Sequence, residues 1–481
     1  MTRTYDIIIL GGGIGGYSAA IRAAQLGKSV AIVEKDKLGG TCLHRGCIPS
    51  KSLLRSAEVF ATMQRSEEFG ISAEGVTLRF AKVQERKQAV VEQMYKGLQF
   101  LMKKHKIDVI AGIGRVIGPS IFSPRSGAVA IERNDGDAET LVPTNLIIAT
   151  GSSPRLLPNL EPDGKRILTS DEALELDELP RSIVIIGGGV IGVEWASMLS
   201  DFGVQVTIVE AGGRLAPTED EDVSRELERL FKKRGIKVMT NAAVLTDRVE
   251  RSDEGVSLAV RVREQEERLD AEAVLVSVGR QANASSLGLE NTDVRVEGGF
   301  IKVNDHFQTT EAHIYAVGDV NGGLQLAHVA AHEGILAAEH IAGPGAGEAG
   351  IGAAHRYAAH LVPRCIYGRP EIASVGWTEK QARDQGYNVK VGKFSFKALG
   401  KAVVLGESDG FVKVVADAAT DDLLGVHIIG PHATDSIGEA AVAQLLNAAN
   451  WEVGRTIHPH PTLSEAIGEA MLAADGLAIS I

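Results

Sequence analysis

A glycine-rich pattern occurs twice in the chain, and the two copies lie 176 residues apart with no gap between equivalent positions. In each copy an apolar strand pattern leads into the glycines and a helical pattern follows them. The glycines are Gly11, Gly13 and Gly16 in the first copy, and Gly187, Gly189 and Gly192 in the second. Such a turn binds a dinucleotide, because glycine lets the backbone approach a pyrophosphate and the helix N-terminus carries the positive end of its dipole. The repeat therefore predicts two Rossmann-like nucleotide-binding domains in an α/β chain.

An acidic residue completes each copy 23 positions beyond its first glycine, Glu34 in the first and Glu210 in the second. A carboxylate there accepts hydrogen bonds from ribose hydroxyls and would repel a 2′-phosphate. Glu210 therefore favours NAD over NADP, and Arg214, four residues further on, is the nearby cation that could instead reach a phosphate. The alternative for either copy is a glycine-rich turn without a ligand. The strand, helix and acidic residue together argue against it.

Two of the three cysteines, Cys42 and Cys47, are five positions apart and precede a helical pattern that we expect to begin at Ser50. In a regular helix, Cα atoms five residues apart are roughly 8.5 Å apart, whereas a disulfide needs a Cα separation of about 4.4–6.8 Å. If the two cysteines pair, the segment between them must therefore be irregular or tightly wound. Three nearby glycines supply backbone freedom for this. They are Gly39, Gly40 and Gly46.

We interpret Cys42 and Cys47 as a redox-active pair. A structural staple would close a very small loop, a metal half-site would need more ligands than the local His44, and two unreactive thiols are the remaining alternative. The third cysteine, Cys365, is predicted to be a small buried side chain. Three cysteines make no secreted disulfide framework, which indicates a reducing cytoplasm where a spaced pair is more often catalytic.

Two dinucleotides and a redox thiol pair together require a flavin. Dithiols give up an electron pair through a thiolate adduct, whereas nicotinamide accepts only hydride. One of the two dinucleotides must therefore be a flavin if the thiols are to exchange electrons with the nicotinamide.

Composition disfavours several classes of partner. A net charge of −12 argues against nucleic acid and anionic membranes. The longest apolar run, residues 183–199, contains four glycines and Glu194, and it is therefore not a membrane span. The first strand pattern begins almost at the N-terminus, without a signal-peptide pattern. We expect a cytoplasmic protein that binds neither nucleic acid nor a membrane.

The remaining segments suggest further domains. A strand pattern over residues 146–149 leads into Thr150 and Gly151, and another over residues 314–317 leads to Asp319, at the strand end where ligands bind in open α/β sheets. The last segment has alternating strand patterns and then helices, as in an α+β domain. We predict four domains, residues 1–150, 151–280, 281–350 and 351–481.

A histidine-rich segment stands near the C-terminus. His460 is followed five residues later by Glu465 at a predicted helix start, and this pair could be a base with its orienting carboxylate. A metal site formed with His458 is one alternative. Surface polar residues, with Glu465 merely favouring the helix dipole, are the other. Spacing alone leaves the three open.

Together these segments resemble the FAD-dependent pyridine nucleotide-disulfide oxidoreductases of class I, and within them the dihydrolipoamide dehydrogenases, over essentially the whole chain. The matching segments, in the family's order, are residues 11–34, 39–51, 149–151, 187–210, 316–319 and 458–465. The resemblance implies two nucleotide-binding domains, a central domain that completes the FAD site, and a C-terminal α+β domain that forms a homodimer.

The resemblance also implies roles at the redox centre. Cys42 would be the interchange thiol that meets the substrate, and Cys47 the thiolate that contacts the flavin. Lys51 would lie near the flavin ring and pair with Glu194. His460 would be the acid/base, oriented by Glu465, and it would act on the disulfide of the partner subunit.

The cofactor-binding residues follow in the same way. For FAD, the resemblance implies the first glycine motif, Glu34 at the adenosine ribose, Thr150 and Gly151, and Asp319 near the ribitol. For NAD, it implies the second glycine motif, Glu210 and Gly279. No metal is implied.

The implied reaction is the oxidation of dihydrolipoamide on the lipoyl domain of a 2-oxo acid dehydrogenase or glycine-cleavage complex, with reduction of NAD⁺ to NADH. His44-Arg45 replaces the family's more usual asparagine-valine, and Ala282 replaces a frequent proline, but neither departure removes a catalytic group. Rival hypotheses are another disulfide reductase, such as a glutathione or mercuric reductase, and a flavoprotein scaffold without turnover. Glu210 argues against a glutathione reductase, and the lack of a C-terminal cysteine pair argues against a mercuric reductase. The complete set of thiols and base argues against a scaffold without turnover.

Overall fold

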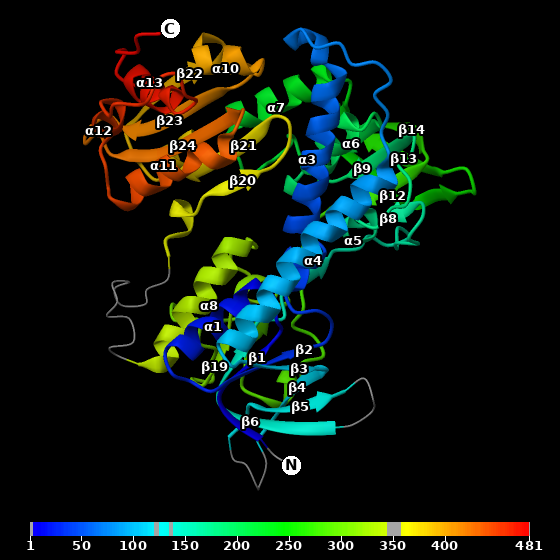
Figure 1. The fold of residues 1–481 in the computed structure, drawn as a ribbon, viewed down its shortest axis with the longest axis vertical. Helices are drawn as coiled ribbons and strands as arrows, with labels where there is room; N and C mark the ends of the chain where they lie inside the picture. The colour runs from blue at the N-terminus through cyan, green and yellow to red at the C-terminus, as the bar shows by residue number, and fades with distance from the viewer. Residues whose placement is uncertain (1–2, 120–124, 134–137, 344–356, 481) are drawn as a thin grey trace. The chain divides into compact units, whose positions relative to one another are not determined.

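The computed structural model describes the chain except for residues 1–2, 120–124, 134–137, 344–356 and 481 (Figure 1). The chain divides into two compact units, each assembled from three stretches. The first unit is Met1–Ser52, Glu85–Arg155 and Arg280–Tyr357, and the second is Leu53–Gln84, Leu156–Gly279 and Ala358–Ile481. Two of the boundaries fall inside the long helices α3 (Cys47–Gln64) and α4 (Phe80–Lys104). The four-domain division stays a prediction.

A seven-stranded sheet forms the centre of the first unit. Its parallel part has the order β3-β2-β1-β6-β19, and β5 and β4 extend it in antiparallel fashion. The strands are β1 (Arg3–Leu10), β2 (Val30–Glu34), β3 (Asp108–Ala111), β4 (Ile113–Ile117), β5 (Ala128–Glu132), β6 (Ala138–Ile148) and β19 (Ile314–Ala316). The last four residues of β1 are at most 2% exposed, as expected of a central parallel strand that is covered on both faces.

Two helices of the first unit, α1 (Ile14–Gln25) and α8 (Ala327–Ala342), lie side by side (Figure 1). Their backbones approach closely, because a Cβ atom at Gly334 would lie only 2.3 Å from the carbonyl oxygen of Gly15. An ion pair of 2.6 Å between Arg22 and Glu339 joins them further along. This packing fixes α1, and with it the turn before α1, against the sheet. The short elements of the unit are α2 (Gly40–His44), β7 (Ser152–Pro154), β16 (Arg280–Ala282), β17 (Val296–Glu297) and β18 (Phe300–Ile301).

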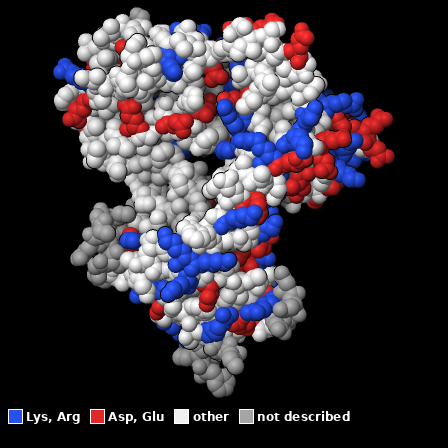
Figure 2. All heavy atoms as spheres, viewed as in Figure 1, with Lys and Arg blue, Asp and Glu red and all other residues white. Residues whose placement is uncertain are grey.

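The second unit contains a five-stranded parallel sheet of order β11-β10-β9-β15-β8 and a three-stranded antiparallel sheet of order β12-β13-β14. The parallel strands are β8 (Ile167–Leu168), β9 (Ser182–Ile186), β10 (Gln205–Val209), β11 (Lys237–Met239) and β15 (Ala273–Val276). The antiparallel strands are β12 (Ala242–Arg251), β13 (Val256–Val262) and β14 (Gln265–Ala271), and acidic and basic side chains intermingle over them (Figure 2). The helices of this part are α5 (Ser170–Ala173), α6 (Val190–Asp201) and α7 (Glu221–Lys233).

The C-terminal part of the second unit is a five-stranded antiparallel sheet of order β20-β21-β24-β23-β22 with helices packed on it. The strands are β20 (Arg364–Ile366), β21 (Glu371–Gly376), β22 (Val389–Ser395), β23 (Phe411–Asp417) and β24 (Leu423–Gly430). The helices are α9 (Glu379–Asp384), α10 (Gly400–Leu405), α11 (Ala433–Leu445), α12 (Asn450–Gly454) and α13 (Glu465–Ala473). A Cβ atom at Gly392 of β22 would lie 1.9 Å from the carbonyl oxygen of Ala470, so α13 packs directly on the strand backbone. The predicted α/β class with a C-terminal α+β domain is confirmed.

The structure corrects one helix boundary. The helix expected from Ser50 begins three residues earlier, at Cys47, because Ile48 and Pro49 also adopt helical conformation and proline is tolerated in the first turn. None of the helices in the described part of the chain is long and apolar enough to span a membrane.

A buried cation joins α7 to the C-terminal sheet within the second unit. The side chain of Lys413 on β23 is 3% exposed, and its Nζ lies 2.8 Å from Asp220, 3.0 Å from Asp222 and 2.9 Å from Glu379. Burial opposes the charge, but the hydrogen bonds to Asp220 and Glu379 raise the pKa of Lys413 above its ordinary value. The amine therefore stays charged and neutralises the buried carboxylate of Asp220 and the two half-buried ones of Asp222 and Glu379.

Replacement of Lys413 by methionine should lower the free energy of unfolding by about 3–5 kcal/mol, because it leaves the buried carboxylate of Asp220 without its counterion. Equilibrium urea unfolding measures the loss. Lys380→Met is the matched control, since Lys380 is 69% exposed and pairs with Asp384 on the surface, and its loss should be within about 0.5 kcal/mol. Equal, small losses in both variants would contradict the assignment.

Candidate active site

The first glycine motif forms the tight turn between β1 and α1. Gly11 has φ +101°, and a Cβ atom there would lie 2.4 Å from the carbonyl oxygen of Ala149. A Cβ atom at Gly16 would lie 2.0 Å from the carbonyl oxygen of Gly11. Gly13 is the N-cap of α1, and among the described residues no side chain caps this helix start. An uncapped helix N-terminus behind a glycine turn fits the pyrophosphate of a dinucleotide.

The second motif repeats this construction between β9 and α6. Gly187 has φ +107°, and a Cβ atom there would lie 2.4 Å from the carbonyl oxygen of Ser277, while one at Gly192 would lie 2.0 Å from the carbonyl oxygen of Gly187. Gly189 is the N-cap of α6, again without a side-chain cap from the described residues. A Cβ atom at Gly189 would meet no heavy atom of the described chain within 4 Å. Space for a pyrophosphate is therefore present at this turn.

The two predicted ribose carboxylates make the same hydrogen bonds in their own motifs. Glu34 accepts the N–H of Gly12 at 2.7 Å with one oxygen and that of Asp36 at 2.8 Å with the other. Glu210 accepts the N–H of Gly188 at 2.6 Å and that of Gly212 at 2.5 Å. Each carboxylate oxygen thus accepts one backbone N–H and keeps a further acceptor site for a ribose hydroxyl.

The similarity between the two copies continues beyond the glutamates. The gap-free alignment of the two copies did not reveal this. The N–H of Gly39 donates to the carbonyl oxygen of Gly12 at 2.8 Å, and the N–H of Ala216 donates to that of Gly188, also at 2.8 Å. The preceding leucine is buried in both copies and lies against the first turn. These leucines are Leu38 and Leu215. Their offset is 177 rather than 176 residues, so a gap-free comparison does not align them.

A segment that we call the cysteine loop, residues 35–46, links β2 to α3 and contains Cys42, while Cys47 follows directly after it. Cys42 lies in the short helix α2, and Cys47 is the first residue of α3. Their thiols are hydrogen-bonded to each other. This bond and burial raise the pKa of Cys42, although Lys51 and the N–H of Cys47 act in the opposite direction. Helix α2 stops at His44, so the expected break between the two cysteines is present.

The cysteine loop packs directly on the first glycine turn. Gly39 and Gly40 have φ +111° and +57°, in the left-handed region that favours glycine. A Cβ atom at Gly40 would lie 2.7 Å from the Cα atom of Gly13, and one at Gly12 would lie 2.7 Å from the side chain of Leu38. Only glycine on both sides permits this approach. The contact places the cysteines next to the turn that fits a pyrophosphate.

The predicted histidine–glutamate pair forms in the second unit. Nδ1 of His460 lies 2.8 Å from a carboxylate oxygen of Glu465, whose other oxygen accepts the N–H of Thr462 at 2.8 Å. Burial opposes ionisation, but the Thr462 N–H and His460 lower the pKa of Glu465 below its ordinary value. The carboxylate therefore holds the proton of His460 on Nδ1, which leaves Nε2 as the proton acceptor. The His460 side chain is 77% exposed, so a substrate has access to it.

The neighbouring His458 has a separate carboxylate. Its Nε2 lies 2.7 Å from Glu439 of α11, and its ring packs against Gly468 of α13. His458 and His460 thus engage different glutamates. Among the described residues, no group of three or more His, Cys, Asp or Glu side chains is placed to hold a metal ion.

Comparison with protein families assigns nearly the whole chain. Residues 5–334 match the model described as pyridine nucleotide-disulphide oxidoreductase, and residues 362–471 match the dimerisation domain of the same group. The chain belongs to the pyridine nucleotide-disulphide oxidoreductases. The dimerisation domain supports the predicted homodimer.

Individual relatives of this oxidoreductase agree over their full length. The chain is 60% identical to dihydrolipoyl dehydrogenase of Bacillus subtilis (strain 168) over 480 residues, which is 100% of both chains. It is 42% identical to dihydrolipoyl dehydrogenase of Zymomonas mobilis, again over 100% of both. Among solved structures, LpdA from Mycobacterium tuberculosis superposes with a TM-score of 0.88 at 28% identity, covering 98% of this chain and 99% of that one. The prediction of an FAD- and NAD-dependent disulfide oxidoreductase is therefore confirmed.

The residues near Glu210 agree with NAD as the nicotinamide cofactor. The guanidinium of Arg214 donates to the carbonyl oxygen of Pro217 at 2.7 Å and lies 3.9 Å from Glu221. Arg214 thus already has a carbonyl and a carboxylate as neighbours. Gly279, the other predicted NAD contact, has φ +111°, and a Cβ atom there would meet no heavy atom of the described chain within 4 Å.

Asp319 lies in a short turn after β19, and its contacts are with residues next to the predicted Thr150–Gly151 and Gly279 sites. Its carboxylate accepts the hydroxyl of Ser152 and lies 3.8 Å from Arg280. Thr150 donates to the carbonyl oxygen of Asn283 at 2.8 Å, and the N–H of Asn283 donates to the carbonyl oxygen of Gly151 at 2.9 Å.

Glu333 of α8 holds the backbone of the Asp319 turn. Its side chain is 1% exposed, and it accepts the N–H of Gly318 at 2.7 Å and the Asn321 side chain at 2.8 Å. Sequence reasoning missed this residue. A glutamate on an otherwise apolar helical pattern, LAHVAAHEGILAA, was the available signal.

Some predicted partners belong to different units. Lys51 lies in the first unit and Glu194 in the second, so their pairing stays a prediction. Glu194 is 7% exposed and accepts the N–H of Tyr367 at 2.9 Å. The cysteines lie in the first unit and His460 in the second, so a catalytic role shared between them likewise stays a prediction.

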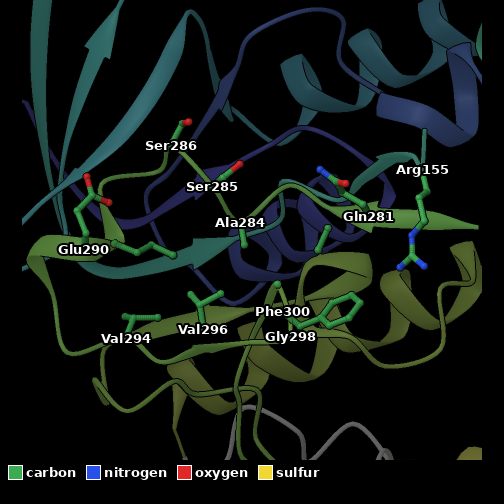
Figure 3. Close-up of a pocket in the computed structure, with 13 residues that line it drawn as sticks. Arg155, Gln281, Ala284, Ser285, Ser286, Glu290, Val294, Val296, Gly298 and Phe300 are labelled. Atoms are coloured by element: carbon green, nitrogen blue, oxygen red, sulfur yellow. The ribbon is translucent and has the colours of Figure 1, made fainter. Parts of the chain in front are cut away.

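A cavity of about 540 Å³ in the first unit is lined in part by Ala282, the residue that replaces a proline frequent in the family. Its lining includes Arg155, with Glu290 and the apolar side chains of Val294 and Val296 on other walls (Figure 3). None of the predicted cofactor or catalytic residues is among its lining residues. The cavity is therefore separate from the dinucleotide turns.

Substitution of Gly40 by alanine should displace the cysteine loop from the first glycine turn, because the added methyl group would overlap the backbone of Gly13 at a positive φ. We expect FAD content per purified chain to fall at least several-fold, as read from the flavin absorbance. Gly97→Ala is the matched control, since Gly97 is exposed on α4 and has open space around it. Alanine there should stabilise the helix by about 0.5–1 kcal/mol and leave FAD bound. Full FAD content in Gly40→Ala would contradict the proposed packing constraint.

Proposed function

We propose that the chain oxidises dihydrolipoamide to lipoamide and passes the electron pair through Cys42, Cys47 and FAD to NAD⁺, giving NADH. The observation that carries this proposal is the hydrogen-bonded thiol pair packed on a dinucleotide-binding turn. The full-length likeness to two dihydrolipoyl dehydrogenases supports the choice of substrate. The natural carrier of the dihydrolipoamide would be the lipoyl domain of a 2-oxo acid dehydrogenase or glycine-cleavage complex.

The substrate side of the reaction needs a base near a disulfide. His460 accepts the proton of a dihydrolipoamide thiol at Nε2, because Glu465 keeps Nδ1 protonated. The resulting thiolate attacks the sulfur of Cys42, and Cys47 leaves as a thiolate. The second thiolate of the substrate then attacks the mixed disulfide, which releases lipoamide and frees Cys42. In the homodimer, His460 would serve the cysteine pair of the partner subunit.

The two thiols have different roles in the reduced pair. The raised pKa of Cys42 keeps this sulfur protonated at neutral pH, where it donates a hydrogen bond to the other sulfur. The negative charge of the reduced pair would reside on Cys47, because this residue begins the 18-residue helix α3 and the positive end of the helix dipole favours a thiolate there. FAD, when bound, supplies the two-electron carrier that connects the dithiol to hydride transfer.

The cofactors would be held by the two repeated turns. The first turn and Glu34 would bind the pyrophosphate and adenosine ribose of FAD, with Asp319 toward the ribitol. The second turn and Glu210 would bind NAD, and the carboxylate of Glu210 would disfavour the 2′-phosphate of NADP. Thr150, Gly151 and Gly279 border these sites.

Formation of NADH from dihydrolipoamide tests the proposal against its main rival. Glutathione reductases usually use NADP, so a rival of that kind would instead reduce glutathione disulfide with NADPH. We expect NADH formation with dihydrolipoamide and negligible oxidation of NADPH by glutathione disulfide. The opposite pattern would replace the proposed substrate, and no turnover with either pair would favour a scaffold role.

His460→Gln should reduce turnover with dihydrolipoamide by about 10²- to 10⁴-fold, the usual contribution of a positioned base. FAD content should stay unchanged, because His460 lies in the C-terminal domain and outside both glycine turns. The matched control is His432→Gln, an exposed histidine that pairs loosely with Asp435 at 3.7 Å, and its turnover should match that of the unmodified protein. Near-normal turnover in His460→Gln would remove this residue from the scheme.

The two cysteine variants should differ in the spectrum of the reduced protein. Cys42→Ser keeps the Cys47 thiolate and should show long-wavelength thiolate–flavin absorbance, whereas Cys47→Ser should lack it. Both variants should lose dihydrolipoamide oxidation while retaining FAD. Absorbance of this kind in Cys47→Ser, measured after anaerobic reduction, would refute the assignment of the two sulfurs.

A further inference from the structure

The cysteine loop carries two side chains that depart from the family's usual asparagine-valine, His44 and Arg45. They lie between the two cysteines, two and three residues after Cys42. Each of them contacts another residue of the first unit: His44 contacts Leu38, and Arg45 contacts Asp36. Their contacts indicate what this departure does.

His44 fastens the loop to itself and to α4. Its Nε2 lies 2.9 Å from the carbonyl oxygen of Leu38, and because a carbonyl only accepts, Nε2 carries the proton. The imidazole also meets the ring of Tyr95 edge to face, with centroids 5.3 Å apart and an interplanar angle of 73°. Leu38 is itself buried against the first glycine turn. His44 thus connects the residues after Cys42 to the part of the loop that packs on this turn.

Arg45 connects the same stretch to Asp36, the residue whose backbone N–H donates to Glu34. Its guanidinium pairs with the side chain of Asp36, and the backbone N–H of Asp36 donates to Glu34 at 2.8 Å. A short chain of contacts therefore runs from the loop between the cysteines to the carboxylate proposed to hold the FAD ribose. Asparagine lacks the imidazole ring, and valine lacks the cation, so the usual residue pair could not reproduce these two contacts.

We propose that His44 and Arg45 are positioning residues that hold Cys42 in register with Cys47 and the flavin by tying the end of the cysteine loop to its beginning, at Leu38 and Asp36. This inference rests on the proposed function. During the reaction, Cys42 alternates between a bond to Cys47 and a bond to the substrate sulfur, so the loop must return the two sulfurs to the same relation in every cycle. The contacts of these two residues with Leu38, Tyr95 and Asp36 restrict how far Cys42 can move.

The effect should appear in thiol chemistry rather than in overall stability. The Arg45 and Asp36 side chains are 55% and 46% exposed, and an exposed ion pair contributes little to unfolding. Small displacements of reacting atoms, in contrast, reduce rates strongly. A merely structural role would lower stability and all activities together, whereas a positioning role lowers only the steps that use the thiols.

The test uses the FAD-containing full chain and two variants. His44→Phe keeps an aromatic ring beside Tyr95 but removes the donor to Leu38, and Arg45→Val removes the cation. We expect flavin reduction by dihydrolipoamide, followed in a single turnover, to slow by about 3- to 10-fold in each. Reduction of ferricyanide by NADH, which draws electrons from the flavin without using the thiols, should be unchanged, as should FAD content. The thiolate–flavin absorbance of the reduced variants should fall.

Three further variants give controls and a mechanism. Arg45→Lys keeps the charge and should restore most of the rate lost in Arg45→Val. Asp36→Asn keeps the backbone N–H to Glu34 but removes the ion pair, and its combination with Arg45→Val should be no slower than Arg45→Val alone. Arg268→Val removes an exposed arginine from an ion pair on β14 and should match the unmodified protein in every assay.

The outcomes separate this inference from the proposed function. If the unmodified protein does not reduce its flavin with dihydrolipoamide, the proposed function fails. If it does, but both variants match it in rate and in thiolate–flavin absorbance, the positioning role is wrong. Equal losses in the dihydrolipoamide and ferricyanide assays would also overturn it, because they would indicate general disruption of the flavin site.

Discussion

Contact between two glycine-containing backbones is the constraint on which the arrangement of this site depends. Gly40 meets Gly13, and the N–H of Gly39 bonds to Gly12, so at these residues the backbone of the cysteine loop lies directly on the backbone of the dinucleotide turn. A methyl group at Gly40 would overlap the backbone of Gly13 and push the two segments apart. A disulfide that works beside a flavin needs such closeness, because electrons pass between groups in contact. The left-handed conformations at Gly39 and Gly40 are therefore a requirement of the chemistry as well as of the fold.

Comparison of the two nucleotide-binding motifs shows which features they share and which are found only in the first. Ala216 bonds to Gly188 as Gly39 bonds to Gly12, and a buried leucine precedes each. After this point the two copies diverge, since the first continues into the cysteine loop and the second into Pro217. The cysteines thus extend a nucleotide-binding unit that is otherwise duplicated. In the proposed function, the same kind of turn would serve a flavin with a thiol neighbour in one copy and a nicotinamide in the other.

Sequence reasoning succeeded where local chemistry dictates the structure. The glycine turns, the carboxylates of Glu34 and Glu210 beside them and the contact between His460 and Glu465 are set by local sequence, and their hydrogen bonds form within one turn or at one strand end. It failed where distant segments meet. The carboxylate of Glu333 under the Asp319 turn and the bond from His458 to Glu439 depend on how helices pack, which no periodic pattern reveals.

The start of α3 at Cys47 rather than Ser50 connects fold to reactivity. A sulfur at the first helical position lies at the positive end of the helix dipole, where a thiolate is stabilised. Cys42, in contrast, lies within the short helix α2, and its hydrogen bond to the other sulfur keeps it protonated. In the proposed mechanism, these different surroundings make one of two chemically identical side chains the proton-bearing thiol and the other the thiolate. A helix that began at Ser50 would leave Cys47 outside the first turn and away from the positive end of this dipole, so the three extra helical residues favour Cys47 as the charged sulfur of the proposed mechanism.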